Sequence, residues 1–139
     1  MRFEVKTRGH CDFVDVTEEV SGAIGQTGIV EGAALVFLQG TTAALTVMEN
    51  ESGLMTDIKE ALERFAPEQA DYRHHARWGD RNGAAHIRSA VIGTDVVLPI
   101  KDGAPDLGTW QRVMLIDFDE RPRQRAVTVT AWSSGSGRT

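Results

Sequence analysis

The chain has 139 residues, a length that suits one domain with a full hydrophobic core. Its 20 acidic and 15 basic residues leave a net charge of -5 at pH 7, with both signs interspersed. This balance excludes the broad basic face that nucleic-acid binding requires, and no apolar run is long enough to span a membrane. The alternation of Arg121, Arg123 and Arg125 predicts at most a small anion patch on one face of a strand.

The single cysteine and the pattern of the N-terminal residues indicate in which cellular compartment the protein is expected. Cys11 is the only cysteine, so an internal disulfide is impossible and a reducing environment suits the chain. The first seven residues alternate like a strand and do not resemble a signal peptide. We therefore expect a cytoplasmic protein without a membrane partner.

The N-terminal half predicts strands around one helix. Alternating apolar residues predict a strand over 2–8, which Gly9 ends, and a second over 13–16, the two forming a hairpin. Thr17 is expected to cap a short helix that ends by Gly28. The continuous apolar run 33–39 predicts a strand buried on both faces, and 45–49 predicts the next strand, after a turn of small residues.

The C-terminal half begins with the clearest helix, over 53–65, with Ser52 as its expected cap and Pro67 beyond its end. Residues 87–92 fit a helix or a strand. Further strands are expected over 96–100, 109–117 and 126–132. The sequence thus predicts one α+β domain over 3–132, an antiparallel β-sandwich of about seven strands with two short helices, followed by a flexible tail over 133–139.

Polar residues that could bind a ligand or transfer protons are concentrated between the end of the long helix and residue 86. His74, His75 and His86 lie there, and because His74 and His75 are adjacent, only one of them is expected to face a site. The twelve-residue spacing of His74 and His86 is not a zinc signature, so a metal site and hydrogen bonds to loop backbone both remain open. Asn82 precedes Gly83, a pair that a turn alone explains.

Other candidates are scattered along the chain, each with a plain alternative. Thr41 and Thr42 offer hydroxyls to an anion beside the bare backbone of Gly40, or are ordinary strand residues. Glu49 offers a half-buried carboxylate for proton transfer or cation binding, or is a solvent-facing strand end. Trp110 begins a strand and is expected to fill core.

Taken together, a series of short sequence motifs in this chain resembles the YjbQ-like family over residues 3–132. The motifs are Gly40-Thr41-Thr42-Ala43-Ala44-Leu45 with Glu49, His74, Arg77-Trp78-Gly79-Asp80, Asn82-Gly83 with His86, Gly93, Pro99-Ile100 with Asp102-Gly103, Leu107-Gly108-Thr109-Trp110-Gln111, and Asp117 to Arg125. The resemblance implies a compact α+β fold, a homotrimer, and a pocket of polar residues near a subunit boundary. It also implies a secondary thiamine-phosphate synthase activity, which joins a pyrimidine methyl diphosphate to a thiazole phosphate and releases pyrophosphate.

The resemblance also assigns expected roles. It implies His74, Asn82, His86 and Glu49 as the catalytic group, with His74 and His86 as ligands to a divalent metal, Mg or Zn. A further set of residues is expected to bind the phosphorylated ligand and to stabilise the charge of its diphosphate: Thr41, Thr42, Arg77, Arg88, Trp110 and Gln111.

This sequence departs from the family pattern at Gly40 and Ala84, where many members have His. The loss of two imidazoles weakens the expected metal site. The alternatives to an enzyme are therefore a non-catalytic trimer that binds a small anion or metal, and a trimer whose polar loop only joins its subunits.

Overall fold

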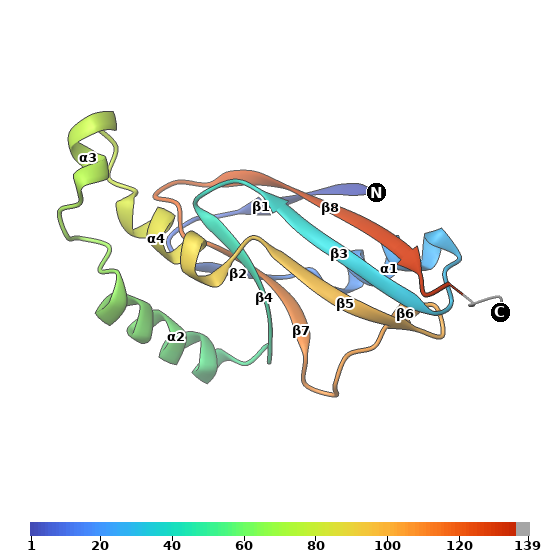
Figure 1. Cartoon of the computed structure of the whole chain (residues 1–139). Coiled ribbons are helices and arrows are strands. Elements are labelled where there is room, and N and C mark those ends of the chain that lie inside the picture. The colour runs from blue at the N-terminus through green and yellow to red at the C-terminus, as the bar shows by residue number, and fades with distance from the viewer. Residues whose placement is uncertain (136–139) are drawn as a thin grey trace.

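The computed structural model describes residues 1–135, except for the side chain of Trp78. This part of the chain forms a two-layer α+β sandwich of eight strands and four helices (Figure 1). One sheet has the order β1-β8-β3-β5-β6 and the other has the order β2-β7-β4, and every pairing is antiparallel. The strands are β1 (Arg2–Thr7), β2 (Asp12–Asp15), β3 (Gly32–Gln39), β4 (Ala43–Met48), β5 (Asp95–Lys101), β6 (Ala104–Pro105), β7 (Arg112–Asp117) and β8 (Arg123–Ser133).

The α+β class and the antiparallel sandwich are confirmed, while the expected hairpin of the first two strands is wrong. β1 pairs with β8 in the larger sheet and β2 pairs with β7 in the smaller one. The reason lies in Gly9, His10 and Cys11, which all have positive φ angles. This left-handed corner carries the chain from one sheet to the other.

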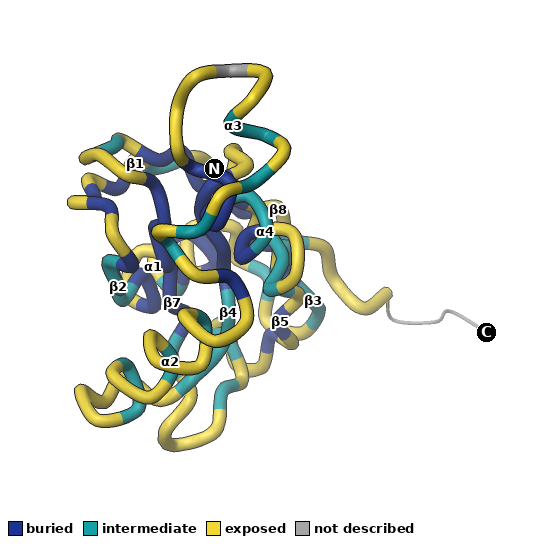
Figure 2. Tube along the Cα trace, turned by 90° about the vertical axis from the view of Figure 1, so that its left-hand side faces the viewer, coloured by how far each residue is buried: buried dark blue, intermediate teal, exposed yellow. Residues whose placement is uncertain are grey.

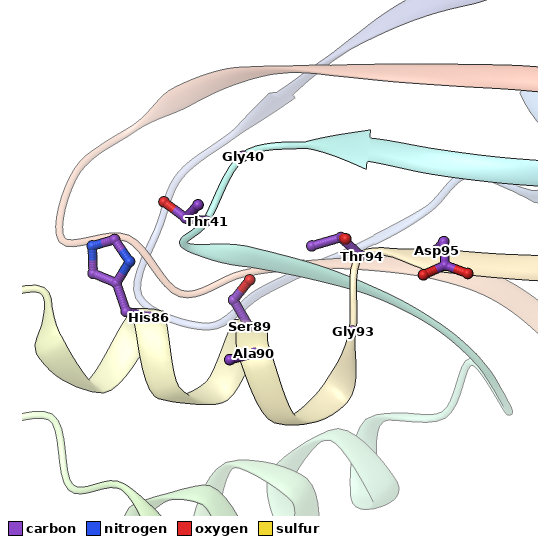
Figure 3. Close-up of a pocket in the computed structure, with 8 residues that line it drawn as sticks. All are labelled: Gly40, Thr41, His86, Ser89, Ala90, Gly93, Thr94 and Asp95. Atoms are coloured by element: carbon purple, nitrogen blue, oxygen red, sulfur yellow. The ribbon is translucent and has the colours of Figure 1, made fainter.

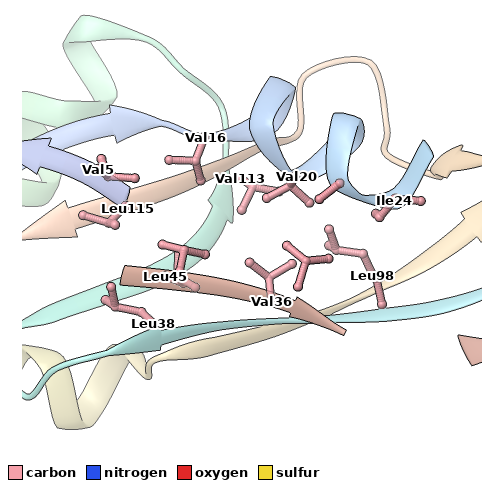
Figure 4. Close-up of a cluster of buried hydrophobic side chains, with 14 of the residues drawn as sticks. Val5, Val16, Val20, Ile24, Val36, Leu38, Leu45, Leu98, Val113 and Leu115 are labelled. Atoms are coloured by element: carbon pink, nitrogen blue, oxygen red, sulfur yellow. The ribbon is translucent and has the colours of Figure 1, made fainter. Parts of the chain in front are cut away.

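The main core lies between the two sheets (Figure 4). β3 turns Ala34, Val36 and Leu38 inward, and all three are fully buried. α1 (Thr17–Thr27) adds Val20 and Ile24 from the end of the sandwich. Thr17 does not cap this helix: Val16 is the N-cap residue, and the Thr17 hydroxyl accepts the Val113 N–H at 2.8 Å.

The other three helices gather at one end of the molecule (Figure 1). They are α2 (Ser52–Phe65), α3 (Arg73–Trp78) and α4 (Gly83–Ile92). α2 begins one residue earlier than expected, because the Glu51 carboxylate, and not Ser52, accepts the Leu54 N–H as its cap. A second apolar cluster under α2 and α4 contains Ile116 and Phe118.

The burial of the strands corrects one expectation about the apolar run 33–39. β3 is buried on one face only, because Phe37 on the outward face is 40% exposed. Its outward neighbours Val97 and Trp132 are 60% and 49% exposed. The strand buried on both faces is β7, which lies between the larger sheet and the cluster under α2 and α4 (Figure 2).

The two ends of the described chain are simple. β8 includes Ser133, and the Ser134 N–H donates to Glu31 O at 3.1 Å, so the ordered contacts run past the expected domain end at 132. Residues 136–139 of the expected tail lie outside the described residues. Within residues 1–135, no helix is long and apolar enough to cross a membrane.

Candidate functional site

A pocket of about 510 Å³ opens where β3 turns into β4 and α4 leads into β5 (Figure 3). It is lined by Gly40, Thr41, His86, Ser89, Ala90, Gly93, Thr94 and Asp95. Three hydrogen bonds connect the segments around the pocket. The Ser89 hydroxyl donates to Ala43 O at 2.6 Å, the Leu45 N–H donates to Gly93 O at 3.0 Å, and the Leu38 N–H donates to Thr94 O at 2.8 Å. The pocket therefore has a fixed frame with hydroxyl, imidazole and bare backbone groups on its surface.

The imidazole of His86 is one of two titratable side chains that line this pocket, the other being the carboxylate of Asp95. Burial lowers the pKa of His86, and the neighbouring His74 lowers it further, against the opposing effects of Asp119, Asp80 and a hydrogen bond with the Thr41 backbone. The ring centroids of His74 and His86 are 4.4 Å apart. The sequence-predicted residues Thr41, His74 and His86 thus come together, and His86 is a neutral imidazole at pH 7.

Several buried polar atoms beside this pair lack a partner. They are His74 Nδ1, His75 Nδ1 and Asn82 Oδ1, and none of the three has a hydrogen bond within the described residues. His75 Nε2 accepts the Gly83 N–H at 3.0 Å, so a neutral His75 carries its proton on the unpartnered Nδ1. Asn82 is the N-cap residue of α4, yet its side chain makes no capping bond. Buried groups of this kind are normally paired, so the lack of a partner at all three atoms marks this place as a candidate binding site.

Thr42 does not share the pocket with Thr41, although both lie in the bend between β3 and β4. Its hydroxyl is buried, accepts from Arg125 Nη2 at 2.6 Å, and donates to Asp119 Oδ2 at 2.8 Å. Arg125 also holds Asp117 through two bonds of 2.6 and 2.9 Å. The predicted role of Thr42 as an anion-binding hydroxyl is therefore wrong for this protomer.

The charged network behind the pocket was missed in the sequence. Asp119 is fully buried; burial raises its pKa, but bonds from Thr42, the Glu120 backbone and Arg123 outweigh this effect and lower it. Arg123, which is half-buried, donates to Asp119 at 3.0 Å, and the buried Arg125 pairs with Asp117, so both guanidiniums are held in ion pairs and do not form the predicted anion patch. One sequence feature could have indicated this network: Asp117 and Asp119 are two residues apart, and so are Arg123 and Arg125.

Arg88 is also placed differently from its predicted role in phosphate binding. It is buried on α4, donates to Ala66 O at 3.1 and 2.9 Å, and pairs with Glu63 at 2.8 Å. Its guanidinium carbon lies 5.8 Å from the centroid of the Phe118 ring. Arg88 therefore ties the end of α2 to α4, because helical spacing turns it toward α2. Arg77, on α3, is exposed and is not part of the pocket lining.

Glu49, Trp110 and Gln111 lie at the opposite end of β4. Glu49 and Trp110 line a second hollow of about 350 Å³. All six residues of β4 lie between Thr41 and Glu49, and they alone span roughly 20 Å at about 3.3 Å per residue. Trp110 is 72% exposed and does not fill core, while the Gln111 side chain accepts the Gly108 N–H at 2.8 Å. The expected convergence of Glu49 with the imidazoles is therefore wrong within one protomer.

A resident metal does not fit the side chains of one protomer. Among the described residues, no three His, Cys, Asp or Glu side chains are placed to hold an ion together. His74 and His86 form only a pair, and zinc usually has at least three protein ligands. The metal role of this pair stays a prediction that requires ligands from elsewhere.

The class defined by this fold and pocket is a small α+β sandwich with paired imidazoles beside a polar hollow. The chain belongs to the YjbQ-like UPF0047 family, whose model matches residues 1–134. It is 36% identical over 131 residues to a UPF0047 protein of Archaeoglobus fulgidus, covering 94% of this chain and 99% of that protein. It is 34% identical over 123 residues to the UPF0047 protein YugU of Bacillus subtilis, covering 88% and 90%.

Solved structures show the same fold. A hypothetical protein from Aeropyrum pernix K1 has a TM-score of 0.88 and 33% identity, covering 96% of this chain and 98% of that one. A YbjQ-like protein of unknown function from Sulfolobus solfataricus has a TM-score of 0.87 and 28% identity, covering 96% and 97%. These relatives establish the family and the architecture, and they assign no activity.

Proposed function

We propose that the pocket beside His86 binds a small phosphorylated molecule. The observation that carries this proposal is the meeting of Thr41, the bare backbone of Gly40 and the neutral imidazole of His86 around one hollow of about 510 Å³. Hydroxyl, amide and imidazole groups are common donors to phosphate oxygens. A volume of this size suits a small metabolite.

As the reaction at this site we propose a thiamine-phosphate synthase activity. The carbon–oxygen bond between a pyrimidine methylene and its diphosphate breaks, a carbon–nitrogen bond to a thiazole phosphate forms, and pyrophosphate leaves. The pocket's donors would stabilise the negative charge that develops on the leaving oxygens. His86, with its lowered pKa, would exchange a proton near neutral pH.

Binding without turnover is the second candidate function. The observation that favours it is the position of Glu49, which lies at the far end of β4 from the imidazoles. A protomer with this arrangement has the phosphate-binding groups and lacks the carboxylate of the expected catalytic group. Ala84 adds no further imidazole on α4.

Calorimetry with inorganic pyrophosphate tests the binding proposal. The wild-type protein should bind pyrophosphate, and His86→Ala should weaken the affinity by about ten-fold, as expected for one lost bond to a charged group. His10→Ala is the matched control, because His10 lines a different hollow; it should match the wild type. Failure of the wild type to bind pyrophosphate would reject the proposal. Formation of thiamine phosphate from the two substrates then separates the enzyme from the binder.

We also propose that the chain assembles as a homotrimer through the outward face of the larger sheet. This face, defined by Ala33, Leu35, Phe37, Val97 and Trp132, is apolar and left partly exposed in the protomer. β3, β5 and β8 bring it together, since Leu35 pairs with Val97 and Ala33 with Trp132. Large exposed apolar patches often mark interaction surfaces. Asp95 lines the pocket and pairs with Phe37, so a second copy here would lie beside the pocket.

A further inference from the structure

Arg125 has one nitrogen that the buried network does not use. The residue is only 7% exposed. Its Nε and Nη2 donate to Asp117, and Nη2 also donates to Thr42, with bond lengths of 2.6 to 2.9 Å. Its Nη1 has no hydrogen-bond partner anywhere in the described chain, 1–135. Because Nη1 is not among the fully buried polar atoms that lack a partner, this nitrogen keeps some contact with solvent and is open to a ligand.

The spare nitrogen lies against the wall of the pocket at Gly40. A Cβ atom built on Gly40 would stand 2.8 Å from Nη1, so this nitrogen occupies the space that a side chain would need. Gly40 itself lines the pocket, and its φ of +143° is a conformation that glycine favours. Arg125 is not itself a lining residue of the pocket, so the close approach of its Nη1 to Gly40 is what links this guanidinium to the pocket.

The charge around Arg125 is balanced, and its direction is fixed. Asp117 and Asp119 face two cations, Arg125 and Arg123, so the network has no net charge. The bidentate bond to Asp117 orients the guanidinium before any ligand arrives, which lowers the entropy lost on binding. The carboxylate of Asp95 would repel an anion, but Asp95 pairs with Phe37, three residues before Gly40, roughly 10 Å away along β3.

We propose that Arg125 is the anion anchor of this pocket: its Nη1 donates to a phosphoryl oxygen held at Gly40 and Thr41, opposite the imidazole of His86. This inference rests on the proposed function and adds the residue that selects a phosphoryl group over a neutral ligand. The glycine at position 40 is then required for access, because a side chain there would cover Nη1. Thr42 contributes indirectly, by holding Arg125 in place.

The test is calorimetry with inorganic pyrophosphate on wild type, Arg125→Lys and Arg123→Lys. Lysine at 125 keeps the charge beside Asp117, but its single nitrogen cannot hold that carboxylate and also donate toward Gly40. Arg125→Lys should bind pyrophosphate at least about ten-fold more weakly. Arg123→Lys, in the same network but paired with Asp119, should stay within about two-fold of wild type. Equal weakening in both variants, or none in folded Arg125→Lys, would overturn the inference.

A measurement on the wild-type protein covers the case in which Arg125→Lys does not fold. With arginine labelled in its guanidinium nitrogens, pyrophosphate should shift the Arg125 resonances and leave those of Arg123 in place. A shift confined to other arginines would refute the role of Arg125 even if His86→Ala still weakens binding, and the proposed function would then stand alone. If the wild type binds no pyrophosphate, both proposals fail.

Discussion

The protonation of His86 links the pocket to pH. In the folded protein burial and His74 lower its pKa below the ordinary value of 6.5, so the unfolded chain binds the proton more tightly. His86 therefore favours the folded state above pH 6.5, and this contribution is lost as pH falls from 6.5 through the folded pKa. A phosphoryl anion beside the ring would favour the charged imidazole.

We therefore predict that inorganic pyrophosphate raises the pKa of His86, observed by NMR titration of its ring resonances. By linkage, pyrophosphate affinity should increase as pH falls through the interval between the pKa of the free protein and that of the complex. His10 is the internal control, because its pKa is already raised by its bond to Glu68 and it lies at a separate hollow. An unchanged His86 titration at saturating pyrophosphate would contradict a ligand beside this ring.

Single residues also show how far the sequence could predict the site. Thr41 and His86 are 45 positions apart, and no period or spacing brings them together; only the family resemblance placed them in one pocket. Thr41 and Thr42 are the same residue type side by side, yet in the bend between β3 and β4 the first lines the pocket and the second joins the buried network. Glu49 was misplaced for a related reason, because a strand carries the chain away from a turn.

Among the elements, those with a strong period were predictable. The long helix and most strands were expected within a few residues of their observed bounds. α3 was missed because it has six residues and few apolar ones, too short for a periodic signal. The run 87–92 was ambiguous, and its helical form in α4 turns Ala85, Arg88 and Ser89 toward buried neighbours.

A weak attachment to the rest of the fold is predicted for α2, which has no buried residue. Its end is tied to α4 by Arg88, whose loss would leave the buried carbonyl of Ala66 unpaired. Arg88→Met, which keeps a long unbranched side chain but removes the guanidinium, should lower the free energy of unfolding by about 1–3 kcal/mol. Urea denaturation measures this change, and hydrogen exchange should show the α2 amides opening faster than those of β7.

The control for this prediction is Arg64→Met on the exposed side of α2. Arg64 lies in the last turn of the same helix, and its substitution should change stability by less than about 0.5 kcal/mol. If Arg88→Met left both the unfolding free energy and the exchange of α2 unchanged, Arg88 would not be the tie between the helices.

For the molecule as a whole, the outward face of the larger sheet is the feature that one protomer leaves unexplained. The sequence of β3 has the apolar pattern of a strand covered on both sides, and the protomer covers only one of them. The pattern was therefore informative although the expectation drawn from it was wrong for the isolated chain. A second copy of the chain on this face would complete the burial that the sequence indicates.

We predict that Val97→Glu converts the assembled protein to a monomer, because a carboxylate would be buried without a partner at the centre of this face. Light scattering during gel filtration should give three times the 15.2 kDa chain mass for wild type and one chain mass for Val97→Glu. Phe65→Glu is the matched control: Phe65 is 57% exposed, close to the 60% of Val97, but lies on α2. It should leave the assembly intact.

Since every described group of the proposed anion site comes from one protomer, monomeric Val97→Glu should keep its pyrophosphate affinity within about two-fold. A wild type that is already monomeric, or a Val97→Glu protein of full assembled mass, would show that this face does not join the subunits.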